Sequence, residues 1–133
     1  MKRDYSGSCH CGAVRFRAAI DLEAGTVRCN CSVCRKGRFW LVAVSPQDFH
    51  LDQGAGALST YRFGPGNIDH QFCSRCGVKP FGHARQGPMG EFYAVSVATL
   101  DGVDPQTLAA APVMFVDGAA DAFDRPPAVT SHL

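Results

Sequence analysis

Seven cysteines in three short clusters constrain this chain more than any other feature of its sequence. They stand as Cys9-x-Cys11, Cys29-x-Cys31-x-x-Cys34 and Cys73-x-x-Cys76. Two tetrahedral metal sites closed by protein ligands need eight such ligands, whereas a site that performs chemistry keeps one position open for water or substrate. The count of seven therefore indicates one closed site and one open site.

The spacing within each cluster favours metal binding over disulfides. Side chains alternate faces in a strand, so Cys9 and Cys11 are predicted to project from the same face of one strand. Thiolates bound to one zinc ion lie roughly 3.8 Å apart, which that geometry allows. The two Cys-x-x-Cys clusters have the spacing of zinc knuckles. An odd cysteine count and an N-terminal segment without an apolar run argue against a secreted disulfide protein.

Two other uses of the cysteines explain less of the sequence. A redox Cys-x-x-Cys protein is expected to show a thioredoxin-like βαβ pattern, which this sequence lacks. A single zinc ribbon could be built from the two Cys-x-x-Cys pairs. That arrangement leaves three cysteines without a role: Cys9, Cys11 and Cys29.

The pattern of apolar residues predicts a mainly β protein that forms a single domain over residues 1–133. Short pieces with period-two alternation are separated by Gly, Pro, Asp and Asn, and no long segment shows a helical stripe. The predicted strands are Ala13 to Ala18, Thr26 to Cys29, Trp40 to Ser45, Phe49 to Leu51, Leu58 to Phe63, Ile68 to Phe72, Phe81 to His83, Phe92 to Ala98 and Val113 to Val116.

Turn and capping signals add local detail. The stretch Gly64-Pro65-Gly66-Asn67 predicts a hairpin whose second strand ends at Cys73. Asp104 followed by Pro105 predicts a short helix through about Ala110. Ser32 to Lys36 is predicted to form a helical turn whose amides point toward the neighbouring sulfurs and stabilise thiolates.

Charge and hydropathy exclude several classes of partner. A net charge of +1 leaves no basic surface for nucleic acid or for an acidic membrane. No apolar run approaches the roughly 20 residues that span a bilayer. We therefore expect a soluble cytoplasmic protein, and the 46% hydrophobic content leaves surface for a homodimer.

The cysteine clusters and their flanking residues resemble a known family. The segments Ser8-Cys9-His10-Cys11-Gly12-Ala13-Val14-Arg15-Phe16, Cys29-Asn30-Cys31-Ser32-Val33-Cys34-Arg35-Lys36-Gly37 and Phe72-Cys73-Ser74-Arg75-Cys76-Gly77 are similar, in order, to the glutathione-dependent formaldehyde-activating enzyme family. The resemblance runs from about residue 6 to beyond residue 100. Members of that family commonly carry a tryptophan near the end of the chain, where this sequence has Asp121-Ala122-Phe123-Asp124.

The resemblance implies a fold, two metal ions and a reaction. It implies a β-tent-like arrangement of small antiparallel sheets with few helical turns, in which zinc joins the sheets. It implies a carbon–sulfur lyase that joins glutathione and formaldehyde as S-hydroxymethylglutathione. It assigns a closed structural zinc site to Cys9, Cys11, Cys73 and Cys76, and a catalytic zinc site to Cys29, Cys31 and Cys34.

An open zinc site of three thiolates has a formal charge of minus one, which favours exchange of its fourth ligand for a substrate thiol. A glutathione thiolate with its carboxylates then needs positive charge nearby. Arg35, Lys36 and Arg38 follow the metal-binding turn and are the candidates for binding glutathione. Trp40 begins an apolar strand and is expected to pack in the core.

Several alternatives stay open on the sequence alone. His70 and His83 flank the last cysteine pair, and either could close the three-cysteine site. A non-catalytic zinc module that carries a thiol or binds a protein is a second possible function. A methionine sulfoxide reductase would need a reactive cysteine in the C-terminal half, and no cysteine follows Cys76.

Overall fold

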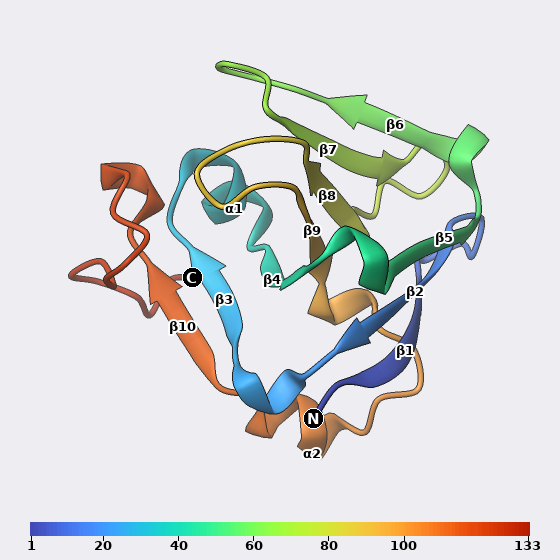
Figure 1. The fold of residues 1–133 in the computed structure, drawn as a ribbon, viewed down its shortest axis with the longest axis horizontal. Coiled ribbons are helices and arrows are strands. Elements are labelled where there is room, and N and C mark those ends of the chain that lie inside the picture. Colours follow the sequence, from blue (N-terminus) through green and yellow to red (C-terminus); the bar gives the residue numbers. More distant parts are fainter.

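The computed structural model describes residues 1–133 and shows a mainly β chain with two sheets and only short helices, which confirms the predicted fold class (Figure 1). No helix has the length and apolar character needed to cross a membrane. The strands are β1 (Arg3–Ser8), β2 (Arg15–Ile20), β3 (Thr26–Cys29), β4 (Trp40–Val44), β5 (Phe49–Gln53), β6 (Leu58–Tyr61), β7 (Ile68–Cys73), β8 (Phe81–Ala84), β9 (Phe92–Ser96) and β10 (Val113–Val116). The α-helices are α1 (Ser32–Gly37) and α2 (Pro105–Ala110).

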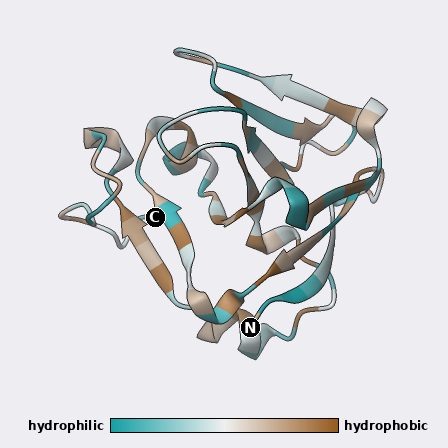
Figure 2. Ribbon diagram, in the orientation of Figure 1, coloured by the Kyte–Doolittle hydropathy of each residue, from teal (hydrophilic) through white to brown (hydrophobic).

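The smaller sheet has three antiparallel strands in the order β1-β2-β5. The sequence did not predict β1, because most of its residues are hydrophilic (Figure 2). Its place depends on Gly7, which lies opposite Phe16 of β2. A Cβ at Gly7 would overlap the Phe16 ring, so the missing side chain gives that ring its place in the core.

The larger sheet has seven strands in the order β10-β3-β4-β9-β8-β7-β6. Strands β6 and β7 form the predicted hairpin. The expectation of antiparallel sheets was wrong in one place, because β10 pairs with β3 in parallel. A parallel pair needs a long crossover connection, and here the intervening chain forms most of the molecule.

The core lies between the two sheets and is rich in aromatic rings. Phe49 of β5 stacks on Tyr93 of β9 with ring centres 4.1 Å apart, and it meets Phe81 of β8 at 4.8 Å. Phe16 of β2 completes the cluster at 5.6 Å from Phe49. Trp40 packs against this core, as predicted, and donates a hydrogen bond of 2.7 Å to Thr26 Oγ1.

The two helices follow their local signals. Helix α2 begins after Asp104, whose carboxylate accepts a hydrogen bond of 2.7 Å from the Gln106 amide, as the sequence predicted. Helix α1 begins after Cys31 without a side-chain cap and buries none of its residues. Its six residues are too few to be stable alone, so α1 depends on contacts with the rest of the chain.

Candidate metal centres

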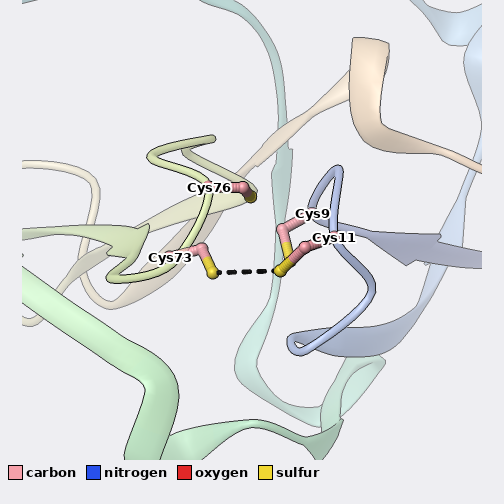
Figure 3. Close-up of side chains that lie close together, drawn as sticks. All are labelled: Cys9, Cys11, Cys73 and Cys76. Carbon is pink, nitrogen blue, oxygen red and sulfur yellow. Dashed lines mark hydrogen bonds between the residues drawn. The ribbon is translucent and has the colours of Figure 1, made fainter.

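Four cysteine side chains from two turns converge between the sheets (Figure 3). Cys9 and Cys11 lie in the turn between β1 and β2, and Cys73 and Cys76 lie at the end of β7 and in the turn before β8. The Cys11 Sγ is 3.7 Å from both the Cys9 Sγ and the Cys73 Sγ. The structure therefore brings together the four residues that the family resemblance grouped.

One premise about this group was wrong. Cys9 and Cys11 were expected to project from one face of a strand, but β1 ends at Ser8 and both cysteines lie in a turn. Gly12 follows in the left-handed region at φ 80°, which glycine takes without strain. The sulfurs converge because the chain turns around them, and not because side chains alternate.

Backbone amides point at these sulfurs. The Val14 amide donates to the Cys9 Sγ at 3.3 Å, and the Arg75 amide donates to the Cys73 Sγ at 3.4 Å. Hydrogen bonds from the amides of Cys11 and Val78 lower the pKa of Cys76 to about 6. These donors favour thiolates, which are the form that binds metal.

The second group consists of Cys29, Cys31 and Cys34, whose sulfurs all lie within 4.8 Å of one another. Cys29 ends β3 and is 6% exposed, whereas Cys31 and Cys34 stand at the start of α1 and are partly exposed. No histidine, aspartate or glutamate joins this group. One short segment thus supplies three possible ligands, two of which are partly exposed.

Hydrogen bonds distribute charge unevenly among the three thiols. Bonds from the Cys29 and Cys34 thiols lower the pKa of Cys31, with further help from the amides of Cys34 and Val33. Hydrogen bonds with Cys29 and then with Cys31 raise the pKa of Cys34, and the bond to Cys31 raises that of Cys29. The Cys34 and Val33 amides act on Cys31 in the direction predicted for the turn amides.

Both groups fit a tetrahedral thiophilic ion. Thiolates bound to one zinc ion lie roughly 3.8 Å apart, and the 3.7 Å separations in the four-cysteine group are close to that value. All seven cysteines are free thiols, so no disulfide competes for these sulfurs. The chain thus has two cysteine groups, of four and of three, that could each hold a metal ion.

The C-terminal segment packs directly on the three-cysteine turn. The Asn30 side chain donates to Asp117 Oδ1 and accepts from the Ala119 amide, both at 2.9 Å. A Cβ at Gly118 would overlap the Cys29 Sγ and lie 3.1 Å from the Cys31 Cβ. Phe123, from the segment that stands in place of the family's tryptophan, lies beside Gly118 and is 59% exposed.

The cations and histidines singled out in the sequence belong to neither cysteine group. Arg35 and Lys36 on α1 and Arg38 just after it are exposed, and none of them forms an ion pair. The His70 Nδ1 lies 2.8 Å from the Lys79 Nζ, and the His83 Nε2 lies 2.7 Å from Glu91. Neither histidine belongs to a cysteine group.

Lys79 is the residue near the three-cysteine group that the sequence analysis missed. Burial lowers the pKa of its ammonium, while the charges of Cys34 and Cys31 act in the opposite direction. A single lysine between Val78 and Pro80-Phe81, in an otherwise apolar run, was the available signal.

Comparisons with known proteins agree with this arrangement. A sequence model of the family described as glutathione-dependent formaldehyde-activating enzyme matches residues 4–117. A Halomonas elongata protein, named as a candidate enzyme of that description, is 39% identical over 80 residues, which cover 53% of this chain and 50% of the relative. The match therefore spans half the length of that relative. A crystal structure of a Rhodobacter sphaeroides protein has a TM-score of 0.69 at 34% identity, over 82% of this chain and 99% of that one.

Proposed function

Because this chain belongs to the glutathione-dependent formaldehyde-activating enzyme family, we propose that it condenses glutathione, or a similar thiol, with formaldehyde or another small aldehyde. The product is a hemithioacetal, so the activity is that of a carbon–sulfur lyase acting in the direction of synthesis. The observation that carries this proposal is the three-cysteine group, which one short and partly exposed segment presents without a fourth protein ligand.

In this proposal the two cysteine groups have different roles. Cys9, Cys11, Cys73 and Cys76 hold a structural zinc ion, since together they complete a tetrahedral set. Cys29, Cys31 and Cys34 hold the catalytic zinc ion. When bound there, zinc supplies a Lewis acid that favours the deprotonated form of a thiol placed beside it.

The protein residues around the catalytic group bind and orient the substrates. Hydrogen bonds from the Cys29 and Cys34 thiols, with those of the Cys34 and Val33 amides, favour the Cys31 thiolate, and Gly118 keeps space for the Cys29 sulfur. Arg35, Lys36 and Arg38 bind the carboxylates of glutathione from the end of α1. The substrate sulfur adds to the carbonyl carbon, so a carbon–sulfur bond forms while the carbonyl π bond becomes a hydroxyl group.

The rate of thiol–aldehyde exchange tests this function. Exchange spectroscopy of glutathione with formaldehyde is expected to show faster exchange with zinc-loaded protein than without it. Cys31→Ser should return the rate to the spontaneous background, and Ser32→Ala, an exposed neighbour on the same turn, should not. If the wild-type protein binds glutathione without accelerating exchange, the alternative of a zinc module that carries thiols replaces the enzymatic proposal.

Two further variants test whether the cations near α1 bind glutathione. Arg38 is in the left-handed region at φ 47°, where a residue other than glycine costs roughly 1 kcal/mol. Arg38→Gly is therefore expected to keep or raise stability while weakening glutathione binding, and Lys36→Ala is expected to weaken it too. Each lost ion pair at this exposed surface should cost about two- to fivefold in affinity. Arg3→Ala, on β1, is the matched control, and unchanged binding in Lys36→Ala and Arg38→Gly would refute this role.

A further inference from the structure

Lys79 contacts Phe39, which follows α1 closely in the chain, and it has no acidic partner. It lies in the connection from β7 to β8, with its Nζ 4.2 Å from the centre of the Phe39 ring and 2.8 Å from the His70 Nδ1. It takes part in none of the ion pairs of the structure. The charges that act on it most are those of the Cys34 and Cys31 sulfurs.

The Lys79 side chain is fixed by the residues beneath it. A Cβ at Gly82 would lie 3.9 Å from the Lys79 Cε. The Lys79 side chain therefore runs past Gly82, which has no side chain. His70 is 6% exposed, and burial followed by the charge of Lys79 lowers its pKa to about 4. The His70 ring is therefore neutral at pH 7, and its Nδ1 accepts a hydrogen bond from the ammonium.

This arrangement is tied to the metal-binding turn itself. The Phe39 amide donates a hydrogen bond of 3.0 Å to the Cys34 carbonyl oxygen, so the ring that contacts Lys79 is anchored to α1. Two aromatic rings pack next to His70. Phe63 stacks on His70 with ring centres 5.4 Å apart, and Tyr61 stacks on Phe63 at 5.9 Å. Phe39 thus connects the Lys79 ammonium to the end of α1.

A neutral ring nitrogen and an aromatic face hold a cation without cancelling its charge. The full positive charge of Lys79 is therefore available to a ligand. The exposed cations Arg35, Lys36 and Arg38 differ in this respect, because solvent screens them. A half-buried, preorganised ammonium suits an anionic oxygen that forms close to the thiol.

We infer that Lys79 binds the anionic oxygen that develops on the aldehyde when a thiol adds beside the three-cysteine group, with His70 as the residue that positions it. The inference rests on the proposed function, and it assigns to Lys79 the binding of the oxygen of the aldehyde. The site then has separate groups for the sulfur and for the oxygen of the adduct.

The chemical balance is simple. The thiol releases its proton to solvent, its sulfur forms a bond with the carbonyl carbon, and the π electron pair moves onto the oxygen. That oxygen then takes one proton from solvent, so no net proton is gained or lost. Lys79 acts by charge and hydrogen bonding while the oxygen is negative, and it keeps its own proton throughout.

Binding of two small thiols tests this role apart from activity. Thioglycolate carries an anionic oxygen near its sulfur, and ethanethiol is its neutral counterpart. Both would be titrated into cobalt-substituted protein, with the thiolate-to-cobalt charge-transfer bands as the readout. The wild-type protein should prefer thioglycolate by about tenfold or more, as expected for a charge-assisted hydrogen bond. Lys79→Met should reduce that preference to about twofold or less, because only weak screened contacts remain.

Matched variants separate a binding role from a structural one. Lys79→Arg should keep part of the preference, and Lys2→Met, a change just before β1, should keep all of it. The cobalt spectrum without added thiol should be unchanged in Lys79→Met, which shows that cysteine ligation survives. Lys79→Gln gives the same test if the methionine variant does not fold. His70→Asn should retain the preference through its side-chain oxygen, and His70→Leu should weaken it.

The outcomes distinguish this inference from the proposed function. If Lys79→Met or Lys79→Gln keeps the thioglycolate preference, or if the wild-type protein has none, Lys79 does not bind the oxygen, although thiol binding still supports the proposed reaction. If the wild-type protein binds neither thiol, the proposed function fails and this inference fails with it.

Discussion

His70 is buried against Lys79, and its protonation state should respond to that neighbour. Burial and then the Lys79 charge lower its pKa to about 4, against an ordinary value near 6.5. Between these two pH values the unfolded chain binds the proton more readily than the folded chain does. The contribution of neutral His70 to stability is therefore complete above about pH 6.5 and is lost as the pH falls toward 4.

We predict that an NMR titration of the zinc-loaded protein shows the His70 ring gaining its proton at a pH close to 4. Lys79→Met should move that midpoint upward, because it removes the second of the two causes. A His70 midpoint near 6.5, the ordinary value, would contradict the described burial.

The residues of the candidate sites differ in how far the sequence could identify them. The seven cysteines were identifiable as metal ligands because they stand in short clusters, and their division into groups of four and three was implied by the family resemblance. Lys79 and Gly118 were not, because their positions depend on contacts distant in the sequence. Lys79 reaches the site only when β7 and β8 pair, and Gly118 meets Cys29 only when β10 lies beside β3.

Among the elements, the 3₁₀ turn Gly118–Ala120 packs against one side of the three-cysteine turn. Gly118 has no positive φ, so alanine is compatible with its backbone and is opposed only by contact. The neighbours are the Cys29 Sγ and the Cys31 Cβ, which cannot move without disturbing the sulfur positions.

We predict that Gly118→Ala displaces Cys29 and removes the metal ion from the three-cysteine group, while the four-cysteine group keeps its ion. Metal analysis of protein purified without chelators would show one ion lost of the two that the groups can hold. Gly37→Ala, at the end of α1 with no atom within 4 Å of its Cβ position, is the control and should retain both. Full metal content in Gly118→Ala would show that the turn can shift without cost.

The same contrast between local and distant signals applies to the strands. Thr26–Cys29 and Val113–Val116 were predicted with their observed bounds, because apolar and β-branched residues mark them clearly. Strand β1 was missed because its polar residues give no alternation, and it pairs only because Gly7 admits the Phe16 ring. The parallel pairing of β10 could not be predicted either, since it joins segments more than eighty residues apart.

In the whole molecule, the four-cysteine group links the two sheets. Cys9 and Cys11 belong to the turn of the three-stranded sheet, and Cys73 and Cys76 belong to the β7–β8 turn of the larger one. An ion bound by all four cysteines would close a loop of more than sixty residues, which would restrict the unfolded chain and also join the two sheets in the folded one.

We predict that Cys11→Ser lowers the free energy of unfolding by more than about 4 kcal/mol, as expected for loss of a structural metal. Cys11 is the exposed member of the group, so little packing is lost with its sulfur. The measurement is denaturant unfolding of protein purified in zinc, with His10→Ser, an exposed neighbour in the same turn, as the control. A Cys11→Ser variant as stable as His10→Ser would show that the ion does not hold the sheets together.

The parallel pairing of β10 with β3 has a consequence for how the protein is made. Cys29, Cys31 and Cys34 are synthesised more than eighty residues before the segment that packs against them, residues 117–123. A ribosome must therefore add that intervening length of chain before the turn can be enclosed on that side. During that interval the newborn polypeptide exposes three adjacent thiols.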